Sequence, residues 1–237
     1  MKVNKSFIIS IIIPVFNEEE TIGSLLQHLE QQAAHKEAME VLVIDGGSSD
    51  ATVQIAEAHG ATVMSSEKGK AKQMNLGARY AKGTILYFLH ADTFPPAHFD
   101  TAITTAVEKD EKAGCFRLQF NSPSRFLLFF SWFTRFNIPL CRGGDQSLFI
   151  TKNLFKKMGG FNDSYRIYED NEFIGRLYRQ ASFTVLPLKV LTSARKYEVN
   201  GTWTLQYHFT VIHLKKFLGS PPEKLYAYYS KNIQSQM

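Results

Sequence analysis

Acidic and amide side chains gather directly after three apolar runs of the sequence, in residues 14–18, 45–50 and 90–93. In an open parallel sheet, ligands bind beyond the carboxyl ends of the strands, so these segments are expected to lie at one edge. Helix caps and turns explain several of these residues. Asp45 and Asp92 fit that explanation poorly, because each follows an apolar run directly and has no cap position to fill.

The elements that must hold these segments alternate between strand and helix patterns in the first half of the chain. Apolar, β-branched runs predict strands buried on both faces, and apolar residues at helical spacing predict helices between them, with Ser48, Ser49 and Asp50 available as N-caps. The alternation predicts an α/β fold with a mostly parallel sheet flanked by helices. The predicted strands are 7–15, 41–44, 61–64 and 84–89, and the predicted helices are 18–33, 48–59, 71–81 and 96–109.

The pattern changes after residue 113. Strands are expected at 115–120 and 147–150, and helices at 124–140, 152–158 and 169–180. The tail, 202–233, reads as two helices separated by the Gly-Ser-Pro-Pro break at 219–222. We therefore expect a domain over residues 1–200 and a helical extension over 201–237 that packs on the same domain.

Composition limits the class of protein. The 237 residues suffice for a full core, and the net charge of +5 suits an anionic ligand or an anionic membrane surface. No long Lys/Arg block occurs, which disfavours nucleic acid. Two cysteines are too few for a disulfide framework, and the apolar run 7–15 is too short to span a bilayer. We expect a cytoplasmic protein, with contact to the inner face of the membrane as an option.

Five blocks in order carry a family resemblance: IIPVFNEEETI, VIDGGSSDAT, ILYFLHADT, GDQSLFITKNLFKKMGGF and YEDNEFIGRLYRQ. Together they resemble family 2 glycosyltransferases of the GT-A fold over residues 7–180. The chain is most similar to a small bacterial branch with a His-Ala-Asp-Thr metal motif and a Gly-Asp-Gln acceptor block. The resemblance implies transfer of a sugar from a nucleoside-diphosphate donor, with a UDP-sugar expected, onto an acceptor hydroxyl.

The resemblance implies a metal site at the end of the fourth strand. Asp92 matches the last acid of the family's Asp-X-Asp motif, which holds Mn²⁺ or Mg²⁺ against the donor phosphates. His90 stands in place of the first acid, with Ala91 between them. His90 either ligates the metal, contacts ribose or phosphate, or has a structural role.

The donor nucleotide is expected to contact residues after the first two strands. Asp45 matches the acid that binds the base or ribose, and Pro14 belongs to the same donor block. Phe16 packs on the base or is a core residue at a strand end. Glu18 contacts ribose or is an acid in the first helical turn.

Basic residues supply candidate diphosphate contacts. Lys70 and Lys72 lie near a helix N-terminus, where anions bind, or they form a solvated basic turn. Arg195 and the neighbouring Lys196 are further candidates late in the chain.

The acceptor side is expected at the start of helix 169–180. Asp170 matches the general base of inverting family members, and Glu169 is the second candidate. Two acids also stabilise a helix N-terminus without any catalytic role. Asp145, in the Gly-Gly-Asp-Gln loop 143–146, is expected to orient the acceptor or the donor sugar.

An aromatic run at 125–137 forms part of the expected helix 124–140. It suits a peripheral membrane contact or an apolar, lipid-linked acceptor, although a core or homodimer interface would need no such role. Two alternatives to sugar transfer stay open: a nucleotidyltransferase on a related scaffold, and a non-catalytic membrane-associated binding protein.

Overall fold

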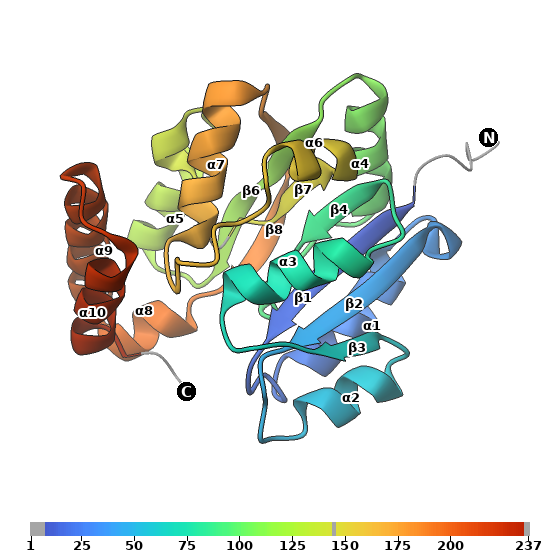
Figure 1. The fold of residues 1–237 in the computed structure, drawn as a ribbon, viewed down its shortest axis with the longest axis horizontal. Coiled ribbons are helices and arrows are strands. Elements are labelled where there is room, and N and C mark those ends of the chain that lie inside the picture. The colour runs from blue at the N-terminus through green and yellow to red at the C-terminus, as the bar shows by residue number, and fades with distance from the viewer. Residues whose placement is uncertain (1–7, 144–145, 235–237) are drawn as a thin grey trace.

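The computed structural model describes residues 8–143 and 146–234. A single eight-stranded sheet runs through the molecule in the order β3-β2-β1-β4-β7-β6-β8-β5, with helices on both faces (Figure 1). The strands are β1 (Ile9–Val15), β2 (Met39–Asp45), β3 (Thr62–Ser65), β4 (Ile85–Phe88), β5 (Thr93–Phe94), β6 (Ala113–Asn121), β7 (Leu148–Thr151) and β8 (Thr184–Ser193).

The helices follow the predicted order, with additions. They are α1 (Ile22–Gln32), α2 (Thr52–Ala58), α3 (Lys70–Tyr80), α4 (Phe99–Glu108), α5 (Arg125–Phe133), α6 (Lys152–Lys157), α7 (Glu169–Gln180), α8 (Arg195–Asn200), α9 (Thr202–Phe217) and α10 (Pro222–Asn232), with short 3-10 turns η1 (Lys36–Ala38) and η2 (Pro139–Cys141).

The first four strands form the parallel half that the sequence predicts. β1 pairs in parallel with both β2 and β4, and β2 with β3. Alternate residues of β1 enter two cores: Ile11 and Ile13 pack with α1 and α4, whereas Ile12 packs with α3. Burial on both faces explains why β1 is apolar at every position except Ser10. The prediction of a mostly parallel α/β fold is confirmed.

The second half of the sheet departs from the simple pattern. β7 runs antiparallel to both β4 and β6, and β8 pairs in parallel with β6 and antiparallel with β5. β5, β8 and α8 were not expected from the sequence. β8 brings residues 192–195 beside the end of β4, because Thr93 of β5 pairs with Thr192.

The predicted helix 124–140 is wrong in its second half, because α5 ends at Phe133. The Thr134 hydroxyl accepts a hydrogen bond from the Leu118 amide, and the buried Arg142 guanidinium donates to the Thr134 and Phe136 carbonyls. The Arg142 bonds occupy two backbone carbonyls that would accept intrahelical hydrogen bonds in a longer helix.

The C-terminal helices α9 and α10 pack together around Leu205, Ile212 and Leu225, and Tyr165 joins that core from the loop before α7. The predicted pair of helices with a break at 219–222 is confirmed. In the part of the chain that the structure describes, no helix has the length and apolar character needed to cross a membrane.

Candidate functional site

The loop after β2 is organised by Asp45, whose carboxylate is nearly buried at 5% exposure. Its oxygens accept hydrogen bonds from the backbone amides of Gly47 at 3.0 Å and Ser48 at 3.1 Å. The expectation that a turn role explains Asp45 poorly was therefore wrong, because its carboxylate holds the backbone of its own loop. The nucleotide role of Asp45 stays a prediction.

The loop after β1 interlocks with the Asp45 loop. Asn17 has a φ of 53°. Its backbone N–H donates a hydrogen bond to the Ser48 hydroxyl at 2.8 Å, and its side-chain oxygen accepts one from the backbone N–H of Ser49 at 2.9 Å. This turn leaves the preceding Phe16 half-buried, outside both cores of the sheet. The Lys68 ammonium lies 3.5 Å from the centre of the Phe16 ring. The core alternative for Phe16 is wrong, and its ring lies beside a cation at the strand-end edge.

Glu18 is not in the first turn of a helix, because α1 begins at Ile22. Its carboxylate accepts a hydrogen bond from the Thr21 hydroxyl and lies 3.4 Å from the guanidinium of Arg195. Arg195 also lies 3.8 Å from the carboxylate of Glu20. A residue predicted from the late part of the chain thus meets the end of β1.

Gln73 was not among the predicted site residues, yet it ties the first two strand ends together. Its buried amide donates to the Val15 carbonyl at 2.8 Å and the Ile44 carbonyl at 2.7 Å. A polar residue on the otherwise apolar inner face of α3, beside Met74 and Gly77, is the sequence signal that indicates such a role. Pro14 is buried within β1 next to this contact.

The two lysines predicted for the diphosphate differ in their surroundings. Lys72 forms an ion pair with the exposed Glu67. Lys70, the first residue of α3, places its ammonium 3.1 Å from Nδ1 of His90. Of the two, Lys70 is the one that the structure joins to other predicted site residues.

His90 bridges Lys70 and Asp170. An ammonium group only donates hydrogen bonds, so Nδ1 of His90 is the acceptor and its proton is on Nε2. That Nε2 faces the Asp170 carboxylate at 3.6 Å. In this arrangement both ring nitrogens of His90 face other side chains, which favours a bridging role for His90 over metal ligation.

Asp92 lies two residues beyond His90, where β5 and β8 hold the chain. Its backbone carbonyl accepts a hydrogen bond from the Ser193 amide at 3.2 Å, and its carboxylate accepts a weak one from the Thr93 hydroxyl at 3.4 Å. The Thr93 and Thr192 hydroxyls are 3.0 Å apart. Ala91 is buried beneath this turn, so the half-buried Asp92 is held on a fixed backbone.

Two acids begin α7, after Tyr168 in the left-handed conformation at a φ of 70°. Glu169 is 4% exposed. Burial, followed by the charge of Asp170, raises the pKa of Glu169 to about 7. Asp170 is more accessible and is the acid that faces His90. Asp145, the remaining predicted catalytic residue, lies outside the described residues.

A protein-only metal centre is not present in the described ranges: no three His, Cys, Asp or Glu side chains there are grouped to hold an ion. Cys115 and Cys141 are both free thiols. The predicted residues instead meet in two sets of contacts, Lys70–His90–Asp170 and Arg195–Glu18. The predicted Phe16 lies against Lys68, which was not predicted.

Solved structures show where this fold occurs. The chain resembles the mannosyltransferase PcManGT of Pyrobaculum calidifontis, solved with GDP-Man and Mn²⁺, with a TM-score of 0.68 at 20% identity, covering 93% of this chain and 69% of that one. It also resembles S. aureus TarS, with a TM-score of 0.67 at 21% identity, covering 84% of this chain and 38% of that one. These are GT-A glycosyltransferases, and the predicted GT-A fold is confirmed.

Relatives in sequence are also named as transferases. An uncharacterised glycosyltransferase of Haemophilus influenzae is 27% identical over 200 residues, covering 77% of this chain and 65% of the relative. An undecaprenyl-phosphate 4-deoxy-4-formamido-L-arabinose transferase of Proteus mirabilis is 25% identical over 205 residues, covering 82% and 58%. The chain thus spans less than two thirds of the length of these relatives. The family model described as glycosyl transferase family 2 matches residues 10–171, and the chain belongs to that family.

Proposed function

We propose that this chain transfers a sugar from a nucleoside-diphosphate donor, a UDP-sugar, onto an acceptor hydroxyl with inversion of the anomeric carbon. The observation that carries the proposal is the contact between His90, at the end of β4, and Asp170, at the start of α7. It supports the proposal because it puts His90, predicted on the donor side, beside Asp170, predicted as the general base. Family membership favours this activity over the nucleotidyltransferase and the non-catalytic alternatives.

Asp170 is proposed as the general base. It takes the proton of the acceptor hydroxyl as that oxygen attacks the anomeric carbon and the bond to the diphosphate breaks. The Nε2 of His90 faces the Asp170 carboxylate at 3.6 Å. Glu169 is the less suitable base because its side chain is buried, whereas the Asp170 carboxylate is the more accessible of the two.

The donor is proposed to lie over the strand ends, with its base beside Phe16 and Asp45 and its diphosphate near Lys70 and Arg195. Two cationic side chains and the positive end of α3 suit a diphosphate. The relative position of Phe16, half-buried beneath the Lys68 ammonium, supports an aromatic contact with the base.

Asp92 fits a hard divalent metal ion, because its carboxylate oxygens are ligands that suit Mn²⁺ or Mg²⁺. The donor phosphates are proposed to complete the coordination, because His90 already faces Lys70 and Asp170. The chemistry that the ion supplies when bound is neutralisation of the leaving diphosphate. PcManGT, solved with Mn²⁺, supports this choice of ion.

The acceptor is proposed to be lipid-linked. The Proteus mirabilis relative is named as a transferase to undecaprenyl phosphate. The exposed aromatic residues of α5 suit an apolar acceptor.

Two variants test the proposal. Asp170→Asn should retain donor affinity by calorimetry and lose about 10²- to 10⁴-fold in turnover. Asp92→Asn should lose Mn²⁺-dependent transfer and donor hydrolysis while the fold stays intact. Asp110→Asn, at an exposed aspartate in the turn before β6, is the control and should match wild type. Full turnover in either site variant would disprove its assigned role.

The donor itself is identified by thermal-shift measurements with UDP-, GDP- and dTDP-sugars, each with and without Mn²⁺. A UDP-sugar is expected to raise the melting temperature most, and only with Mn²⁺ present. A larger shift with a GDP-sugar would correct the donor without affecting the proposed roles of Asp92 and Asp170.

A further inference from the structure

Aromatic rings of α5, of the segment after it and of α9 form a continuous surface, which we call the aromatic surface: Phe126, Phe129, Phe130, Trp132, Phe136 and Trp203. All of these rings are exposed except Phe126, which is half-buried. Trp203 lies 4.4 Å from Phe126, and Phe126 lies 4.5 Å from Phe130. The contacts continue along α5, with Phe133 between Phe129 and Trp132, and end at Phe136.

The aromatic surface is open to solvent to an unusual degree. Trp203 is 75% exposed, Phe129 58% and Trp132 47%. α5 buries only Leu127, so most of its apolar side chains have no partner in the described core. A contiguous apolar surface of this kind marks an interaction site, whereas single exposed apolar residues do not.

The segments that carry the aromatic surface are basic. Residues 121–143 contain no acid and three arginines, of which Arg125 and Arg135 are exposed and Arg142 is buried. Residues 194–234 contain six Lys or Arg and two Glu. Just after α5, the Arg135 guanidinium lies 4.5 Å from the Trp132 ring. Aromatic rings with flanking arginines match the boundary of an anionic bilayer, where rings lie among headgroups and cations meet lipid phosphates.

We propose that the aromatic surface docks on an anionic lipid bilayer. The same charges oppose the competing occupant, a second copy of the chain. A two-fold interface places the same surface of each copy against the other and would bring their basic residues together. Anionic headgroups instead complement the arginines.

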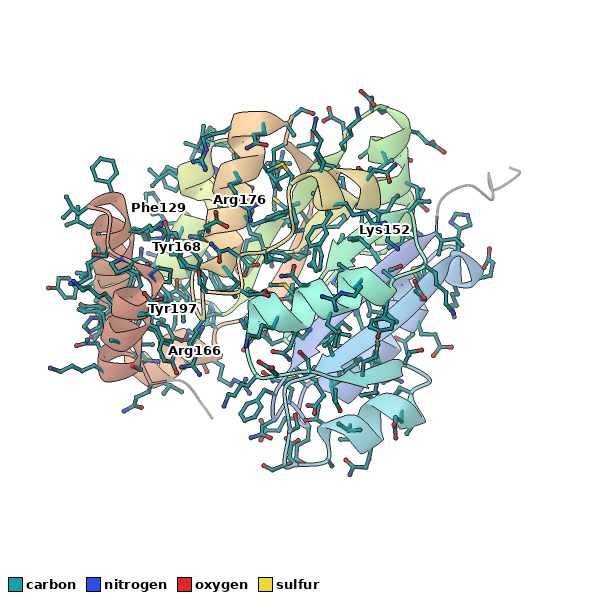
Figure 2. The ribbon with its side chains drawn as sticks, viewed as in Figure 1. Phe129, Lys152, Arg166, Tyr168, Arg176 and Tyr197 are labelled. Carbon is teal, nitrogen blue, oxygen red and sulfur yellow. The ribbon has the colours of Figure 1, made fainter. Side chains whose placement is uncertain are left out.

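The docked orientation also bears on the candidate site. The Tyr168 hydroxyl lies 2.9 Å from Nδ1 of His213 in α9, and Arg166 stacks on Tyr226 of α10. Figure 2 shows Tyr168, Arg166 and Tyr197 between the α9–α10 pair and the rest of the molecule, with Phe129 on the side that carries α9. A bilayer bound through α5 and α9 would therefore lie on the side of the molecule where α7 begins with Glu169. The docking proposal stands on this geometry and does not depend on sugar transfer.

The two tryptophans of the chain, Trp132 and Trp203, both belong to the aromatic surface, so intrinsic fluorescence reports on it without a label. Vesicles of phosphatidylcholine with one quarter phosphatidylglycerol are added to the full chain. We expect a blue shift of the emission and quenching by lipids brominated along the acyl chain. Vesicles of phosphatidylcholine alone should give a weaker response. An unchanged spectrum with the anionic vesicles would disprove the proposal.

Co-sedimentation with the same vesicles separates the contributions. Phe129→Ser with Trp203→Ser should weaken partitioning at least about tenfold through lost apolar area. Arg125→Gln and Arg135→Gln should each weaken it about fivefold, since a juxtamembrane cation contributes about 1 kcal/mol. Tyr80→Ser, which removes an exposed aromatic ring from the end of α3, is the matched control and should sediment like wild type.

Analytical ultracentrifugation decides between the bilayer and a second copy. A monomer that gains a blue shift only with anionic vesicles supports docking. A blue shift that instead follows protein concentration together with dimer formation, and that vesicles leave unchanged, would overturn the proposal in favour of a homodimer.

Discussion

Replacing Glu169 with glutamine tests how the buried acid of α7 affects stability. Its side chain is 4% exposed, and burial raises its pKa from 4.5 to about 7. Each pKa unit corresponds to about 1.4 kcal/mol, so full ionisation of Glu169 costs the folded state about 3 kcal/mol. Between these two values the folded chain binds more protons at Glu169 than the unfolded chain. This contribution to stability therefore falls as pH rises through that window.

Urea unfolding of wild type and Glu169→Gln, at about pH 5 and about pH 8.5, measures the effect. Glutamine has no charge to bury. The charge contribution should therefore raise the free energy of unfolding of Glu169→Gln over wild type by under about 1 kcal/mol at the lower pH and by about 3 kcal/mol at the higher pH. The unsatisfied amide of glutamine adds a cost of its own, but that cost is the same at both values. The change in the difference between the two pH values is the quantity that tests the reasoning.

Two further variants serve as checks. Glu108→Gln, at an exposed acid of α4, should show no such pH-dependent gain. Lys70→Met removes a cation that lowers the pKa of Glu169, so the loss of stability should move to higher pH. Equal advantages for Glu169→Gln at both pH values would refute the claim that Glu169 is buried with a raised pKa.

Three more predictions concern stability. Asp45→Ala removes the carboxylate that accepts two backbone amides of its loop and should lower the free energy of unfolding by about 2 kcal/mol in urea titrations; an unchanged value would contradict that role. Gln73→Met withdraws the donor from two strand-end carbonyls and should cost about 1–3 kcal/mol by the same titration, whereas a stabilised variant would show that the bond is not needed. Arg176, whose guanidinium donates to the Gly160 carbonyl and to Glu172, anchors α7 beside the preceding loop (Figure 2). Arg176→Met should lower the melting temperature by about 4 °C or more, and calorimetry without such a drop would contradict the anchor.

The elements with strong local signals were predictable. The bounds of α7 match the predicted 169–180, because Glu169 and Asp170 open it and Phe173, Ile174 and Leu177 recur at helical spacing. β1 was equally clear, since a strand covered on both faces is largely apolar, and only Ser10 of β1 is polar.

β8 was missed because its sequence lacks a clean strand pattern. Pro187 lies inside it, and proline disfavours a paired strand. The pairing explains how it is tolerated: Phe116 faces Leu186 and Arg117 faces Lys189, so Pro187 and Leu188 bulge out of register. Such a bulge depends on the partner strand and is not visible in a local pattern.

For the candidate site, the sequence predicted which residues follow the strand ends, but it did not predict which side chains they contact. Arg195 and Glu18 are 177 residues apart, and Lys70 meets His90 only because α3 begins beside the end of β4. The role of Asp45 in its loop was missed because it depends on the backbone N–H groups of Gly47 and Ser48 pointing at the carboxylate. The sequence alone does not show in which direction backbone N–H groups point.

The mixed pairing of the sheet has a consequence for how the chain acquires its structure. β1 to β4 lie within residues 9–88 and are joined by local βα connections, whereas β6 pairs with β8 across seventy residues, from Gly114 to Thr184. Long loops close more slowly, so we expect β1 and β2 to gain hydrogen-exchange protection before β8 in pulse-labelling during refolding. The loops after β1 and β2, where we propose that the nucleotide binds, would then form before β8 brings Arg195 beside Glu18.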